Sequence, residues 1–179
     1  MSSDKNFVTS MAAILAEHKI MSAKEAQSLV LNFSNQSDIT FDEFVISQGL
    51  VSKEDMLNVL SEYYQVPAVD VRGLFFDIGL VKSMPKEFLL HYGILPMEVD
   101  QDIMTVVAYR PDIPGLESKL EEYGSYVIEF RVGLWSDIVD VINECYEEPI
   151  LTEQDMSADD AEELIEAEDI DLISDEQSI

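Results

Sequence analysis

The uneven distribution of charge along the chain constrains its fold most strongly. Residues 132–179 contain 17 acidic and no basic residues, whereas residues 1–131 contain 20 acidic residues and all 10 basic ones. An acidic segment without counter-charges repels itself and buries too little apolar surface to fold alone. We therefore expect a folded region followed by an acidic, disordered tail or linker over residues 149–179.

Net charge and hydropathy exclude several classes of protein. A net charge of −27 argues against a nucleic-acid binder, which needs basic residues to neutralise phosphates. A tail that mimics nucleic acid stays an alternative, although its apolar spacing argues mildly against it.

No apolar run approaches the roughly 20 residues of a membrane helix, so we expect no membrane insertion. With no secretory signal and a lone Cys145, the sequence indicates a cytoplasmic protein.

Two pairs of short helices are expected over residues 1–66. Apolar residues recur at helical spacing, and the segments starting at Ser22, Thr40 and Ser52 have the form of capping boxes. Shifting the sequence by 30 residues places Lys19 on Gly49 and Ser22 on Ser52. This register indicates a duplicated helix–turn–helix unit.

Residues 67–148 have the pattern of a small α/β subdomain. Strands are expected at residues 94–99, 103–108 and 126–132, with a short β-prone run at 68–71. Pro96 confines its strand to an edge or a bulge. Helices are expected at 85–92, 114–123 and 136–145, the last capped by Ser136. We predict an α+β fold: a helical subdomain, then a sheet of about three strands, partly parallel and flanked by helices, then the tail.

No catalytic or metal-binding constellation is visible in the sequence. None of the 7 glycines forms a phosphate-binding loop, which excludes an ATPase. His18 and His91 lie far apart and Cys145 has no second cysteine, so we predict no metal site. Cys145, Ser125 and Ser136 are conceivable nucleophiles without an oriented base. We predict no enzyme, no catalytic residue and no cofactor.

The aromatic residues are expected to be mostly core. For the adjacent pair Tyr63 and Tyr64, we predict that one ring packs inside and that the other is exposed to a partner. The remaining aromatics assigned to the core are Phe75, Phe76, Phe88, Tyr92, Phe130 and Trp135.

Three stretches carry a family resemblance. Residues 49–71 end in a Pro-x-Val-Asp link, residues 84–97 hold a helix followed by Tyr-x-Ile-Leu-Pro, and residues 103–108 form a Val-Val-Ala strand. In this order they resemble the N-terminal domain of type II secretion and type IV pilus assembly ATPases. The resemblance covers about residues 11–147, and it departs from the family pattern at Tyr109-Arg110-Pro111.

Some members of that family bind cyclic di-GMP through a repeated Arg-Leu-Gly-x-x-Leu-x-x-x-Gly pattern, followed by two leucines and a glutamine. In the second helix pair, Thr40 stands at the arginine position and Asp42 at the first glycine. In the first pair those positions hold Ser10 and Ala12. The missing guanidinium groups and the added carboxylate argue against binding of this nucleotide. The degenerate motif positions of the second pair are Thr40, Phe41, Val45, Gly49, Met56, Leu60 and Tyr63.

The resemblance implies a non-catalytic adaptor domain that docks on a protein of a bacterial secretion or pilus machinery, held at the inner membrane through that partner. The alternative is a regulatory module that senses a cyclic dinucleotide through its degenerate motif. The ATPase modules that follow this domain in the family are absent, which leaves a stand-alone protein and a fragment both open. We expect the tail to take part in partner binding through Leu164, Ile165, Ile170 and Leu172.

Overall fold

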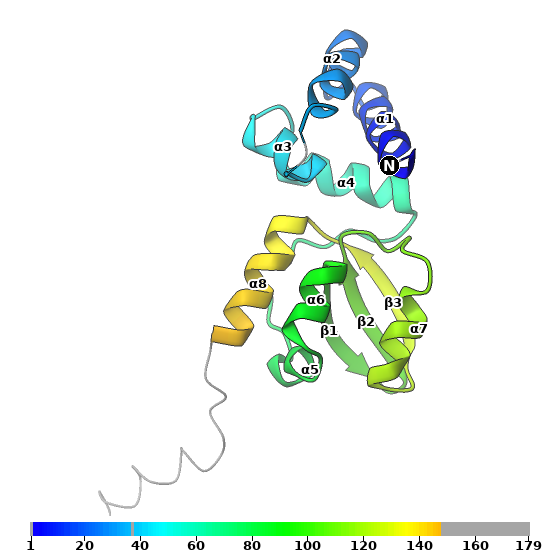
Figure 1. The fold of residues 1–179 in the computed structure, drawn as a ribbon, viewed down its shortest axis with the longest axis vertical. Helices are drawn as coiled ribbons and strands as arrows, with labels where there is room; N and C mark the ends of the chain where they lie inside the picture. The colour runs from blue at the N-terminus through cyan, green and yellow to red at the C-terminus, as the bar shows by residue number, and fades with distance from the viewer. Residues whose placement is uncertain (1, 37, 148–179) are drawn as a thin grey trace, which may run out of the picture. The chain divides into compact units, whose positions relative to one another are not determined.

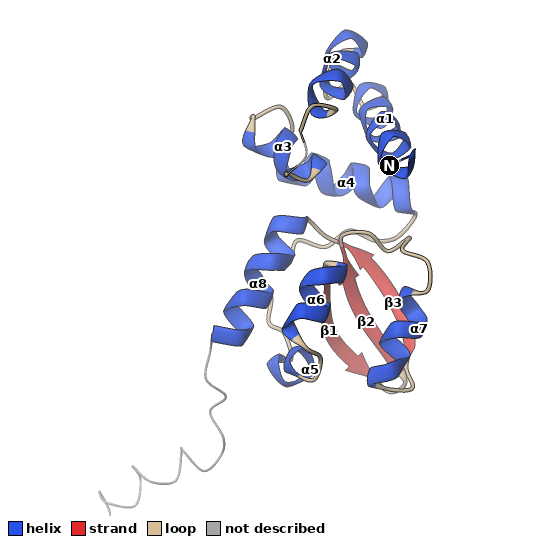
Figure 2. Cartoon of the chain, in the orientation of Figure 1, coloured by secondary structure: helices blue, strands red, loops and turns tan. Residues whose placement is uncertain are grey.

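The structure, a computed structural model, describes residues 2–36 and 38–147. Over these residues the chain forms eight α-helices, one 3-10 helix and a three-stranded sheet, which confirms the predicted α+β class (Figures 1 and 2). By their contacts the described residues form one compact unit, which ends at Glu147. The four apolar residues predicted to bind a partner through the tail lie outside the described residues. The boundary predicted between residues 66 and 67 stays a prediction.

The first four helices form two pairs. Helix α1 (Ser2–Glu17) is followed by α2 (Ala23–Phe33), and α3 (Phe41–Ser47) is followed by α4 (Lys53–Tyr64). Two residues after the last residue of α1 and of α3 the backbone is left-handed, at Lys19 (φ 58°) and Gly49 (φ 66°). One residue later, Ile20 N–H donates to Leu15 O (3.0 Å) and Leu50 N–H donates to Val45 O (2.9 Å). The hydrogen bond that closes the turn therefore repeats at the predicted offset of 30 residues.

The second helix of each pair begins at the predicted serine. Ser22 Oγ accepts the Glu25 N–H (3.3 Å), and the Glu25 carboxylate accepts the Ser22 N–H (2.7 Å), which completes a capping box. This bonding lowers the pKa of Glu25. Ser52 Oγ accepts the Asp55 N–H (3.1 Å) in the same way. The capping box predicted at Thr40 is not formed, because the Thr40 side chain makes no bond to the first turn of α3.

A small α/β arrangement follows. Its sheet has the order β1 (Ile94–Asp100), β2 (Ile103–Ala108), β3 (Val127–Val132), with β1–β2 antiparallel and β2–β3 parallel. The register of edge strand β1 shifts between Pro96 and Glu98, so the predicted edge position and bulge both occur. The predicted run at 68–71 forms only a bridge between Ala68 and Val132. The helices here are α5 (Ile78–Lys82), α6 (Lys86–Tyr92), α7 (Leu116–Leu120), the 3-10 helix η1 (Glu121–Tyr123) and α8 (Trp135–Glu147).

Two hydrophobic clusters hold the described residues together. The helical cluster centres on Met11, Leu15, Phe41 and Leu60 and also receives Val132, which lies beyond the helices in the sequence. The second cluster lies between the sheet and helices α5–α8, and it includes Cys145, buried as predicted. None of the described helices is long and apolar enough to cross a membrane.

Two expectations about this region are wrong. Helix α8 begins at Trp135, so Ser136 lies inside the helix instead of capping it. Phe75, predicted to be core, is fully exposed at 102% of its reference area. In both cases, contacts with residues distant in the sequence decide the outcome, as the next subsection describes.

Candidate functional site

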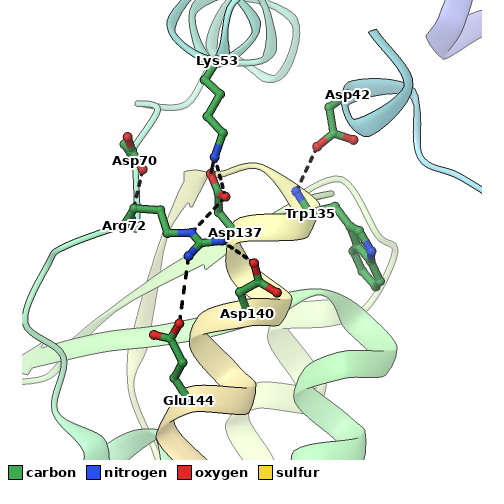
Figure 3. A network of polar contacts seen from close by, with 8 residues as sticks. All are labelled: Asp42, Lys53, Asp70, Arg72, Trp135, Asp137, Asp140 and Glu144. Atoms are coloured by element: carbon green, nitrogen blue, oxygen red, sulfur yellow. Dashed lines mark hydrogen bonds and ion pairs between the residues drawn. The ribbon is translucent and has the colours of Figure 1, made fainter. Parts of the chain in front are cut away.

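A buried carboxylate on α8 joins the helical pairs to the α/β part (Figure 3). The Asp137 side chain is only 3% exposed, and its two oxygens accept Lys53 Nζ of α4 at 2.7 and 2.9 Å. Arg72 Nε donates to the same carboxylate at 3.1 Å. A buried carboxylate loses hydration, and these two cations replace it. Asp137 therefore links α4, the segment after it and α8.

The Arg72 guanidinium contacts two further carboxylates of α8. One terminal nitrogen pairs with Asp140, and the other lies 4.0 Å from Glu144. The hydrogen bond to Asp137 raises the pKa of Arg72, and the neighbouring carboxylates add to that effect. Its own backbone N–H donates to Asp70 Oδ1 at 3.0 Å. These contacts fix Arg72 at the start of the loop that leads to α5.

That loop presents two exposed apolar side chains, and we call residues 73–76 the presentation loop. Gly73 has a left-handed backbone (φ 74°), and Leu74 and Phe75 after it are both exposed. At the far end, Asp77 N–H donates to Met97 O of β1 (3.4 Å), while Asp77 Oδ1 accepts the Leu80 N–H (3.0 Å) at the start of α5. The loop is thus anchored on both sides while Phe75 stands in solvent.

A second carboxylate crosses between the two parts of the chain. Asp42 of α3 is buried, and its Oδ2 accepts the Trp135 N–H at 3.0 Å, so Asp42 caps the N-terminus of α8 from 93 residues away. Burial raises the pKa of Tyr109 well above its ordinary value, and the nearby Asp42 charge raises it further. Burial likewise raises the pKa of Tyr64. Asp42 is therefore a structural cap here.

Most of the degenerate nucleotide-motif positions of the second helix pair lie in the helical core. Phe41, Val45, Met56 and Leu60 are all buried in the helical cluster. The Thr40 hydroxyl is buried with no hydrogen-bond partner among the described residues, and Gly49 lies in the exposed turn. Both rings of the tyrosine pair are half-buried, and each lies close to the ring of Phe7, so neither is the exposed partner contact that we predicted.

A separate hollow of about 680 Å³ opens between α2 and the turns of the two helix pairs. Its lining mixes apolar and polar side chains and contains none of the degenerate motif positions. The lining residues are Ile20, Met21, Ser22, Lys24, Glu25, Ser28, Leu29, Asn32, Phe44, Gln48 and Leu50.

Each histidine contacts a nearby side chain. His18 Nε2 lies 2.6 Å from Glu62 Oε2, and the His91 ring packs edge-on against Tyr92. Within residues 2–36 and 38–147, no three His, Cys, Asp or Glu side chains are grouped closely enough to hold a metal ion.

Comparisons with known proteins define the class of this fold. Residues 64–150 match the family model of the MshEN domain. The chain is also similar to a solved structure of MshE with "cdg", at 22% identity and a TM-score of 0.61, over 76% of this chain and 98% of that one. A structure of the N-terminal domain of XpsE matches at 18% identity and a TM-score of 0.52, over 75% of this chain and 92% of that one. A sequence search of curated proteins gives no match.

These matches confirm the predicted resemblance to the N-terminal domains of secretion and pilus assembly ATPases. Sequence reasoning did not find the presentation loop or the cap formed by Asp42. The only local signal for the loop was Arg-Gly before three apolar residues, a pattern too common to separate an exposed Phe75 from a buried one.

Proposed function

We propose that this chain is a non-catalytic docking domain that binds a protein of a bacterial secretion or pilus machinery. The single observation that carries the proposal is the exposed Phe75 beside Leu74 on the presentation loop. The likeness to the MshE and XpsE N-terminal domains supports the choice of machinery. The chain would work in the cytoplasm and be held at the inner membrane through its partner.

The energetics favour a contact role for Phe75. Moving a phenylalanine side chain from water into an apolar pocket contributes about 1.5–3 kcal/mol. Aromatic side chains that enter a partner's pocket are typical binding hot spots. Because Arg72 and Asp77 already fix both ends of the loop, little conformational entropy would be lost on docking.

A capture experiment tests this function. The full-length chain is used as bait for detergent-solubilised membranes of the cells that make it, and captured proteins are identified by mass spectrometry. We expect a secretion or pilus component, with capture reduced about tenfold or more by Phe75→Ala. Leu31→Ala is the matched control, because Leu31 is also an exposed apolar residue but lies on α2. Equal capture by the wild type and Phe75→Ala would contradict the proposal.

A second candidate function is sensing of a cyclic dinucleotide, favoured by the likeness to MshE, whose structure was solved with "cdg". Here the motif lacks its arginines, and the Asp42 carboxylate is committed to capping α8. Titration calorimetry with cyclic di-GMP distinguishes the two candidates. Micromolar binding that is lost on substitution of Thr40 and Tyr63 would favour the sensor over the docking domain.

A further inference from the structure

The outer edge of β3 carries backbone groups that have no strand partner among the described residues. Val127 N–H donates toward β2, to Asp102 O at 2.7 Å. Val132 faces the opposite way, since its N–H donates to Pro67 O and its carbonyl accepts the Val69 N–H, both at 2.9 Å. Backbone direction alternates along a strand, so the N–H and C=O groups of Ile128 and Phe130 also point outward.

In the described part of the chain, no backbone group pairs with Ile128 or Phe130 on that outer side. The segment around Ala68 already runs parallel to β3 at Val132, which shows that this edge accepts a strand. That segment pairs only with Val132 and does not reach Ile128 or Phe130. Two donors and two acceptors in one line are a template for an added strand.

A hollow is lined in part by Phe130 of the same strand. It has a volume of about 360 Å³ and lies between the β2–α7 connection and Phe130. The apolar residues Ile113, Leu116 and Phe130 line it, together with Asp112 and Glu117. Arg110 Nε already lies 3.5 Å from Asp112 Oδ1, so Glu117 is the acidic residue to which an incoming cation would bind. Such a site suits a lysine or arginine, whose aliphatic stem packs on apolar residues while its charged end pairs with Glu117.

A second copy of the chain fits this edge poorly. Pairing two copies through Ile128 and Phe130 would place Glu129 directly opposite its own counterpart. Glu129 is exposed on the strand, and like charges in opposite positions destabilise a strand pair. The edge therefore favours a different chain with basic side chains.

We propose that β3 binds an extended, basic peptide segment of a partner protein, which adds as a fourth strand beside Ile128–Phe130 and places a lysine or arginine in the hollow beside Glu117. The inference rests on the proposed docking function and adds a second contact surface, separate from the presentation loop. The partner segment is recognised by its extended backbone and its positive charge.

The test uses a fluorescent seven-residue peptide of alternating valine and lysine, with binding to the full chain measured by anisotropy. Two further peptides carry N-methyl groups, one on the valines and the other on the lysines. In an added strand only alternate residues face β3, so one methylated peptide should bind about tenfold or more weakly, while the other is nearly unaffected. Glu117→Gln should also weaken binding, whereas Glu121→Gln, which removes a charge outside the hollow, should not.

Nuclear magnetic resonance on the same protein locates the peptide. We expect the amide signals of Ile128 and Phe130 to shift and their exchange with solvent to slow. The proposal is overturned if no peptide binds, if both methylated peptides bind like the parent, or if those two amides do not respond. If the peptide fails while the full-length chain still captures a secretion or pilus component, only this inference is lost and the docking function stands.

Discussion

Lys53 and Arg72 both pair with the buried Asp137 carboxylate, so either one should partly compensate for loss of the other. Replacing Lys53 by Met leaves the buried carboxylate paired with Arg72, and replacing Arg72 by Met leaves it paired with Lys53. Each cation is nearly half exposed, at 47% and 43%, so solvent screens each pair and each single substitution should cost about 1 kcal/mol.

The double variant is different, because it leaves the 3% exposed carboxylate without a cation. Stranding a buried charge typically costs about 3–5 kcal/mol. Two independent losses would sum to about 2 kcal/mol, so we expect the double variant to exceed that sum by about 1–3 kcal/mol.

Chemical denaturation of the wild type, both single variants and the double variant, at constant pH and salt, measures the coupling. Adding Asp137→Asn to the double variant should restore part of the stability, because the stranded charge is then removed. If the loss of unfolding free energy in the double variant equals the sum of the two single losses within about 0.3 kcal/mol, the view that either cation can stabilise Asp137 is refuted.

Three further predictions follow from the described contacts. Lys19→Gly should stabilise the chain by about 0.5–1 kcal/mol in denaturant titrations, because Lys19 has a left-handed backbone (φ 58°); an unchanged or lower midpoint would contradict this. The raised pKa values of Tyr64 and Tyr109 should make stability fall above about pH 10, where the unfolded tyrosines ionise and the folded ones do not. Up to that pH the tyrosine contribution is complete, and Tyr109→Phe should flatten the alkaline decline; an unchanged decline would argue against it. Deleting residues 149–179 should leave the melting temperature nearly unchanged in calorimetry but weaken partner capture, and a large drop in melting temperature would contradict that separation of roles.

Local signals in the sequence predicted much of the fold. The 30-residue offset between Lys19 and Gly49 predicted two equivalent turns, and both turns close with the same hydrogen bond. The β-branched run of β2 and the edge position of Pro96 were also evident from residue type. These features depend on contacts between residues close in sequence, so residue type and spacing are sufficient to predict them.

Features that depend on distant residues were not predicted. The N-terminus of α8 is capped by Asp42 of α3, a contact across 93 residues, whereas the local pattern favoured Ser136. Phe75 is as apolar as a core residue, but the contacts of Arg72 with Asp137 and of Asp77 with Met97 hold its loop outside the core. Hydropathy alone cannot distinguish an apolar residue that packs inside from one held in solvent by polar contacts on either side.

Photo-crosslinking at position 75 in living cells tests the central claim most directly. A photoreactive phenylalanine analogue replaces Phe75 in the full-length chain, and the same analogue at Leu31 serves as the control position. The account predicts a light-dependent adduct with a secretion or pilus protein from position 75 and none from position 31. No adduct at position 75, or equal adducts at both positions, would contradict it.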